Sequence, residues 1–72
     1  METVEFNLSE GQEFIELFKL LKAIQVIDSG GRAKLIIENE EVIVNEEVET
    51  RKRKKIIKGD IIEVFDTKII VK

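Results

Sequence analysis

The chain has 72 residues, with 12 Lys or Arg against 15 Asp or Glu and a formal net charge of −3. It contains neither cysteine nor histidine, which excludes disulfides, thiolate zinc sites, imidazole metal ligands and the Ser-His-Asp arrangement. A chain of this length forms one small core, and no apolar stretch approaches the roughly 20 residues that span a bilayer. No basic leader precedes an apolar run at the N-terminus. We therefore expect a single domain over residues 1–72, cytoplasmic and without a membrane segment.

The first part of the chain predicts a strand followed by a helix. Residues 3–8 alternate apolar and polar side chains, which is the period of a half-buried strand. The segment Ser9-Glu10-Gly11-Gln12 has the Ser-x-x-Gln form of a capping box, and apolar residues follow it at helical spacing. We therefore expect a first helix over residues 10–22.

A second, shorter helix is expected next. Asp28 and Ser29 are both suitable N-cap residues, because a short polar side chain can accept a hydrogen bond from the first turn. The apolar face formed by Ala33, Ile36 and Ile37 predicts a helix that ends before Asn39.

From residue 42 onward the pattern is that of strands joined by short turns. Strands are expected at residues 42–44, at Val48, and over 56–57, 61–65 and 68–71. Turn residues separate them at Asn45-Glu46, Lys58-Gly59-Asp60 and Asp66-Thr67.

Five consecutive basic residues, Arg51-Lys52-Arg53-Lys54-Lys55, stand in this strand-rich half. Residues 1–50 hold four Lys or Arg against twelve Asp or Glu, a net charge of −8, whereas residues 51–72 hold eight against three, a net charge of +5. Such asymmetry indicates a polyanionic partner. If the run is extended, its odd-numbered and even-numbered residues face opposite ways, so only part of it can contact one surface. The plain alternative is a solvated loop without a ligand.

The start of the second helix offers further phosphate contacts. A helix N-terminus exposes unpaired N–H groups, and Gly30-Gly31 would let a phosphate approach them closely. Arg32 can bind phosphate with its forked guanidinium, and Lys34 adds a charge nearby. Ser29 can cap the helix or bind a ligand, but hardly both.

The four phenylalanines are expected in the core. Phe14 and Phe18 lie one helical turn apart, and Phe6 and Phe65 lie on strand patterns. We therefore expect no exposed aromatic side chain. Recognition of a nucleic acid by its shape and phosphates is then favoured over stacking of single-stranded bases.

Three spaced segments carry a family resemblance: Ser29-Gly30-Gly31-Arg32-Ala33-Lys34-Leu35-Ile36-Ile37, Val42-Ile43-Val44-Asn45, and Lys58-Gly59-Asp60-Ile61-Ile62. This set resembles the RNA-binding domain first defined in small-subunit ribosomal protein four, here called the S-four-type domain. The small size, the leading strand and the segment Val48-Glu49-Thr50-Arg51-Lys52-Arg53 are similar to stand-alone bacterial members of the YbcJ/YaaA kind.

The resemblance implies an α+β fold, with two packed helices that form an L-shaped RNA-binding motif, the alpha-L motif, beside a small and mainly antiparallel sheet. It implies a translation-associated or ribosome-associated monomer that binds structured RNA, ribosomal or transfer RNA, without catalytic activity, cofactor or metal. The RNA-binding residues that we expect are Ser29, Gly31, Arg32, Lys34, Asn45, Arg51, Lys52, Arg53, Lys54 and Lys55.

The chain departs from the family pattern at three positions. Glu13 stands near a position where many members have a basic residue, Gly30 follows the serine where Arg is common, and Glu46 follows the hairpin asparagine where Gly is common. Family members with a basic residue at the first of these positions use it to contact RNA, and we do not expect this contact from Glu13.

A ubiquitin-like sulfur-carrier module that interacts with proteins and not RNA stays open as the alternative. Such carriers resemble the second half of the chain, but they act through a C-terminal Gly-Gly where this chain ends Ile70-Val71-Lys72, and they have two strands before the first helix where we predict one. An enzyme is the least favoured class, because Ser9 and Ser29 are the only serines and neither has a histidine partner.

Overall fold

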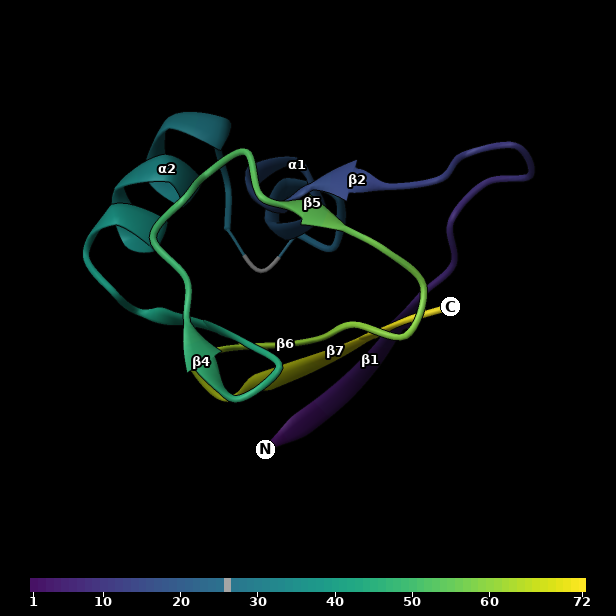
Figure 1. Ribbon diagram of the computed structural model, residues 1–72. Coiled ribbons are helices and arrows are strands. Elements are labelled where there is room, and N and C mark those ends of the chain that lie inside the picture. The colour runs from purple at the N-terminus through teal and green to yellow at the C-terminus, as the bar shows by residue number, and fades with distance from the viewer. Residues whose placement is uncertain (26) are drawn as a thin grey trace.

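A computed structural model describes residues 1–25 and 27–72. Its elements in chain order are β1 (Glu2–Phe6), β2 (Ile15–Glu16), α1 (Leu17–Ala23), α2 (Gly30–Glu38), β3 (Val42–Val44), β4 (Glu47–Val48), β5 (Lys55–Ile56), β6 (Ile61–Val64) and β7 (Thr67–Val71). Figure 1 shows two layers, with the larger sheet below and both helices above it, beside the small β2–β5 sheet.

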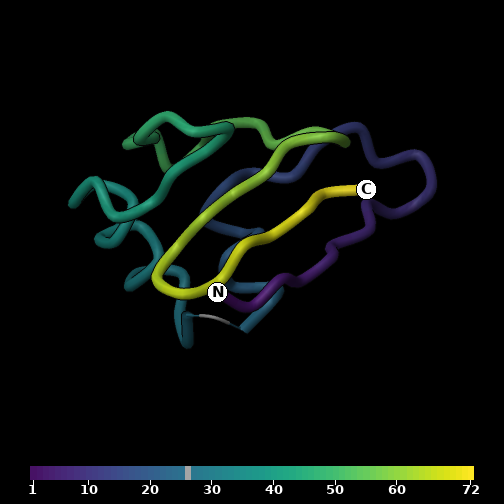
Figure 2. Tube along the Cα trace, turned by 90° about the horizontal axis from the view of Figure 1, so that it is seen from below, coloured from purple at the N-terminus to yellow at the C-terminus, as the bar shows by residue number. Residues whose placement is uncertain are grey.

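The larger sheet has five strands in the order β1-β7-β6-β3-β4. Its β1–β7 pair is parallel, from Glu2 opposite Thr67 to Phe6 opposite Val71, and its other pairs are antiparallel. Figure 2 shows the first strand, in purple, running alongside the last strand, in yellow. The mainly antiparallel sheet expected from the sequence is confirmed.

The core lies between the two layers. Each helix turns one apolar face toward the sheet. Alternate residues of β6 and β7 point toward the helices, as the two-residue period of a strand requires. The buried residues are Leu17, Leu20, Leu21, Ile27, Ala33, Ile36, Ile37, Val42, Val44, Ile56, Ile62, Val64, Ile69 and Val71.

Helix α2 matches its prediction. Ser29 is its N-cap residue, and the Ser29 hydroxyl accepts a hydrogen bond from the backbone N–H of Arg32 at 3.2 Å. The helix ends at Glu38, with Asn39 as its C-cap. No helix in the described ranges 1–25 and 27–72 is long and apolar enough to cross a membrane.

The predicted start of the first helix at residue 10 is wrong, since α1 begins at Leu17. Ser9 and Gln12 do interact: the Ser9 N–H donates to the Gln12 side-chain oxygen at 3.0 Å, and the Gln12 N–H donates to the Ser9 carbonyl at 2.9 Å. They close a turn around Gly11, which has a φ of +83° and cannot continue a right-handed helix. Ile15 and Glu16 then pair with β5 instead.

Two strand expectations are shifted by one residue. The β6–β7 turn consists of Phe65 and Asp66, so Val64 pairs with Thr67, and Phe65 lies at the turn with a φ of 53°. Strand β5 covers Lys55–Ile56, which leaves Ile57 exposed in the next turn. The leading strand is also shorter than expected, ending at Phe6.

The expectation that all four phenylalanines are buried is wrong for two of them. Phe6 and Phe18 pack partly buried against the core. Phe14 is 38% exposed, because it precedes β2 and does not lie on a helix, and Phe65 is 52% exposed, because a two-residue turn holds it outside the sheet.

Candidate nucleic-acid interface

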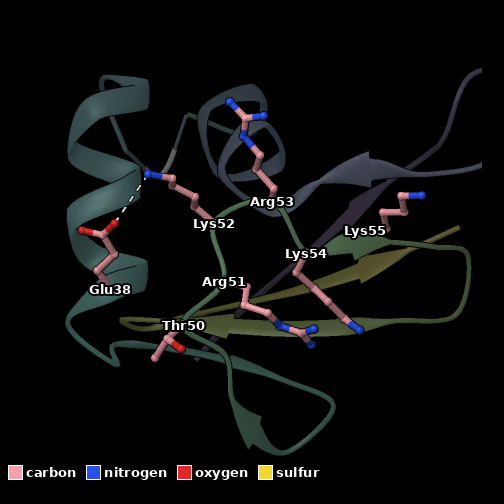
Figure 3. Close-up of a pocket in the computed structure, with 7 residues that line it drawn as sticks. All are labelled: Glu38, Thr50, Arg51, Lys52, Arg53, Lys54 and Lys55. Carbon is pink, nitrogen blue, oxygen red and sulfur yellow. Dashed lines mark ion pairs between the residues drawn. The ribbon is translucent and has the colours of Figure 1, made fainter.

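The basic run surrounds an open hollow of about 610 Å³ (Figure 3). The residues that line it are Glu38, Thr50, Arg51, Lys52, Arg53, Lys54 and Lys55. All five expected cations of the run therefore border the same hollow. Glu38, from α2, is the acidic residue among the described residues that line it.

The backbone of the basic run is held by the start of α1. The N–H of Leu17 donates to the carbonyl of Lys54 at 2.9 Å, and the N–H of Phe18 donates to the carbonyl of Lys52 at 3.1 Å. The α1 N-cap residue, Glu16, makes no side-chain cap, so the loop carbonyls satisfy N–H groups that a helix otherwise leaves unpaired. The loop is thereby fixed through its main chain, and its side chains stay available.

The end of the run is anchored by a buried side chain. Ile56 follows Lys55 directly, is fully buried, and pairs with Ile15 across the small sheet. Burial of a side chain of this size contributes about 1.5–3 kcal/mol. The basic loop is therefore tied to the core at Ile56 and to α1 at Lys52 and Lys54.

The run is not extended throughout, and the expected two-faced geometry is wrong for its first part. Lys52 and Arg53 form a turn, which is closed by a hydrogen bond of 3.1 Å from the Lys54 N–H to the Arg51 carbonyl. In Figure 3 Lys52 points toward α2, while Arg51 and Lys54 extend together on the side opposite to Arg53. The five cations therefore spread around the loop.

Two of the five cations have acidic partners. The Lys52 ammonium lies 3.6 Å from a carboxylate oxygen of Glu38, and the Arg51 Nε lies 2.9 Å from Glu49. The hydrogen bond from Arg51 lowers the pKa of Glu49 against the opposing effect of partial burial, and the charge of Lys54 lowers it further. Within the described ranges Arg53, Lys54 and Lys55 form no ion pair.

The expected residues of α2 lie outside this hollow. Arg32 is exposed and lines a separate hollow of about 240 Å³ with Gln25, Ile27, Asp28 and Phe65. The Lys34 ammonium lies 4.9 Å from the centre of the Phe18 ring. Gly31 has open space where a side chain would begin, and the Ser29 hydroxyl is engaged as the helix cap.

Asn45 is held by contacts within the protein. Its Nδ2 donates to Asp60 at 2.9 Å, and its Oδ1 accepts from the N–H of Ile61 at 2.9 Å. Asp60 in turn accepts from the N–H of Ile57 at 2.9 Å. These bonds join the β3–β4 turn to the turn before β6, which favours a structural role for the Asn45 side chain.

One feature that sequence reasoning missed lies beside the basic run. The Lys55 ammonium is 4.9 Å from the centre of the exposed Phe14 ring, and both line a hollow of about 370 Å³ with Gln12, Ile15, Glu16 and Lys19. The signal available in the sequence was Gly11, because a glycine inside a proposed first turn is a poor helix former and a good turn former.

A family model for the S4 domain matches residues 6–72. The chain belongs to the S4 domain family. It is also 40% identical over 57 residues to the probable ribosome maturation protein RlbA of Bacillus subtilis (strain 168), a match that covers 79% of this chain and 80% of that protein.

The S4 match agrees with the fold. Its two helices beside a mostly antiparallel sheet confirm the α+β architecture expected from the resemblance. A second strand, β2, does precede α1, but it pairs with β5 and not with β1. Membership of the S4 family favours RNA binding over the ubiquitin-like carrier alternative.

Proposed function

We propose that this S4 protein is a non-catalytic RNA-binding protein that recognises structured RNA, ribosomal or transfer RNA, mainly through phosphate contacts and shape. The observation that carries the proposal is the gathering of Arg51–Lys55 around one hollow on a loop whose backbone is fixed by α1. The similarity to a probable ribosome maturation protein supports a function in association with the ribosome. The protein acts as a cytoplasmic monomer, with residues 1–72 as one domain.

The strongest phosphate contacts come from the cations that have no acidic partner among the described residues. Arg53, Lys54 and Lys55 can bind phosphate directly, whereas Arg51 and Lys52 first have to release or share Glu49 and Glu38. A fixed loop loses little conformational freedom on binding, which favours affinity. The contacts of Arg32 and Lys34 extend the surface along α2.

Ser29, Gly31 and Asn45 contribute mainly by shaping this surface. Ser29 orders the first turn of α2, Gly31 keeps the space in front of that turn open, and Asn45 supports the β3–β4 turn. The acidic first part of the chain, with a net charge of −8 over residues 1–50, repels RNA elsewhere and orients its approach.

Binding is tested by fluorescence anisotropy with a labelled ribosomal or transfer RNA and with a DNA duplex of equal length. Neutralising about four phosphates gives a slope of about −3 to −4 for log affinity against log salt. Tighter binding to the RNA with this slope supports the proposal. Absence of binding to the RNA at low salt contradicts it.

A matched pair of variants separates a specific surface from general charge attraction. Replacing Arg51, Lys52, Arg53 and Lys54 with Gln removes four charges from the hollow, and replacing Lys22, Lys58, Lys68 and Lys72 with Gln removes four charges from elsewhere. We expect the first variant to lose RNA binding and the second to keep most of it. Because the loop is held through its carbonyl groups and Ile56, the thermal midpoint of the first variant should fall by no more than that of Glu49→Gln, which loses the same contact between Arg51 and Glu49. Equal losses of binding in both variants would contradict a specific surface.

A further inference from the structure

The hollow beside Phe14 continues the basic surface. Lys55 lines both this hollow and the one formed by the basic run, so the two share a wall. An RNA whose phosphates contact Arg51–Lys55 therefore passes next to the exposed Phe14 ring.

The side chains around Phe14 suit a nucleotide better than a purely apolar ligand. Phe14 is 38% exposed and offers a stacking surface. The Lys55 ammonium lies 4.9 Å from the centre of its ring, and Lys19, paired with Glu16, lines the same hollow. Stacking on an aromatic ring combined with a neighbouring cation is the usual way in which proteins hold an unpaired base and its phosphate.

Lys55 covers the ring in the absence of RNA. Its ammonium lies 4.9 Å from the centre of the Phe14 ring and has no carboxylate partner among residues 1–25 and 27–72. A cation–π contact at an exposed site is weak, so a phosphate competes well for this ammonium. When Lys55 turns to a phosphate, the ring face becomes free for a base.

The second lysine is held differently. The Lys19 ammonium lies 3.2 Å from Glu16, one turn away on the same segment, and its side chain is 61% exposed. Lys19 therefore stays at the edge of the hollow, where it can neutralise a phosphate without covering the ring.

We propose that Phe14 stacks against one unpaired base of the bound RNA, while Lys55 moves from the Phe14 ring to an adjacent phosphate. This inference rests on the proposed RNA-binding function and adds the feature that the RNA presents, an unpaired nucleotide next to a structured segment. It revises the expectation that phosphate and shape recognition is favoured over stacking, since one stack now accompanies the phosphate contacts.

The test compares two labelled RNA hairpins, one with a single bulged adenosine and one in which that nucleotide lacks its base. Because the two differ only in the base, the ratio of their affinities reports stacking. We expect the wild-type protein to bind the adenosine bulge about tenfold more tightly, as for the loss of one base–aromatic stack. We expect Phe14→Leu to bring the ratio to about one, and Phe14→Tyr, which keeps the ring, to preserve it.

The outcomes distinguish the two proposals. Equal affinity of the wild-type protein for both hairpins overturns the stacking role and leaves the proposed function standing. A preference that persists in Phe14→Leu, or one that Phe14→Tyr also loses, overturns the stacking role as well. If the wild-type protein binds neither hairpin at low salt, both this inference and the proposed function fail. A circular dichroism melt of each variant shows that it is folded.

Discussion

The carboxylate of Glu49 accepts three hydrogen bonds from Arg51: from Nε at 2.9 Å, from Nη2 at 3.3 Å and from the backbone N–H at 3.1 Å. The two residues are separated by Thr50 alone, so the contact fixes the chain direction at the entry to the basic loop. The contact also pairs Arg51, one of the cations that line the hollow, with a carboxylate of the protein itself. The basic loop is thus partly neutralised from within the protein, by Glu49 and by Glu38.

The folding stability of the protein should fall at acidic pH, because Glu49 becomes protonated. Because the pKa of Glu49 is lowered in the folded protein, its contribution to stability is present above the ordinary carboxyl pKa of 4.5 and is lost as the pH falls through the lowered value. We expect Glu49→Gln to have a lower thermal midpoint than the wild-type protein near neutral pH, and this difference to close as the pH falls below 4.5. Thermal melts across this range measure it, with Glu47→Gln as the control. A difference that stays constant down to strongly acid pH would count against this account.

Removal of the Glu38 carboxylate should strengthen RNA binding. Glu38 is the acidic side chain of the hollow and lies 3.6 Å from the Lys52 ammonium. Unit charges about 4 Å apart interact by about 1 kcal/mol in water, so Glu38→Gln should raise affinity by up to about fivefold at low salt. The gain should vanish near 1 M salt, where the Debye length is about 3 Å.

The control for Glu38→Gln is Glu2→Gln, which changes the net charge equally at the far edge of the sheet. Salt-dependent anisotropy titrations compare the two variants. An equal gain in both would show that only the total charge of the protein matters.

Substitution of Asn45 should cost stability more than binding. Its side chain bonds to Asp60 and to the N–H of Ile61, and its backbone has a φ of 51°. We expect Asn45→Ala to lower the free energy of unfolding by about 1–3 kcal/mol, through the lost hydrogen bonds and the left-handed backbone. Urea unfolding measures this loss.

Asn45→Gly serves as the comparison, because glycine adopts the same φ freely and lacks only the side-chain bonds. It should be less destabilised than Asn45→Ala. RNA affinity should change little in both variants. A large loss of affinity with unchanged stability would show that Asn45 contacts RNA directly.

Glu46 is a position where the protein can be stabilised. Its φ of 72° follows the positive φ of Asn45, which is the backbone of a two-residue hairpin turn that favours Asn-Gly. We expect Glu46→Gly to raise the free energy of unfolding by about 1 kcal/mol, because a non-glycine residue is strained there. Glu47→Gly, in strand β4, should instead destabilise by about 0.5–1 kcal/mol. Chemical denaturation of both variants checks the opposite signs.

The local parts of the fold were accessible from the sequence. The Ser29 cap, the apolar face of α2 and the Asn45-Glu46 turn depend on residues a few positions apart, and each was predicted. The first helix was placed too early because Ser9 and Gln12 do interact, but through a turn and not a helix. The competing factor is the pairing of Ile15 with Ile56, which is distant in the chain and leaves no local signal.

The candidate site was predictable to a similar degree. The charges of Arg51–Lys55 are visible in the sequence, whereas their spread around a turn depends on α1, whose first N–H groups bond to the loop carbonyls. The exposed Phe14 was missed for the same reason as the helix start. Nothing in the sequence pattern placed Arg32 in a hollow apart from the basic run.

The position of β7 between β1 and β6 has a consequence for how the protein is made. The residues of β1 are synthesised before their partners, Thr67–Val71, since Glu2 pairs with Thr67 and Phe6 with Val71. The five-stranded sheet cannot be completed before β7 is available to pair with β1 and β6, whereas the contacts of the β3–β4 hairpin are local. Closure of this long loop is slow compared with local contacts. We therefore expect the pairing of β1 with β7 to form later in folding than the local contacts.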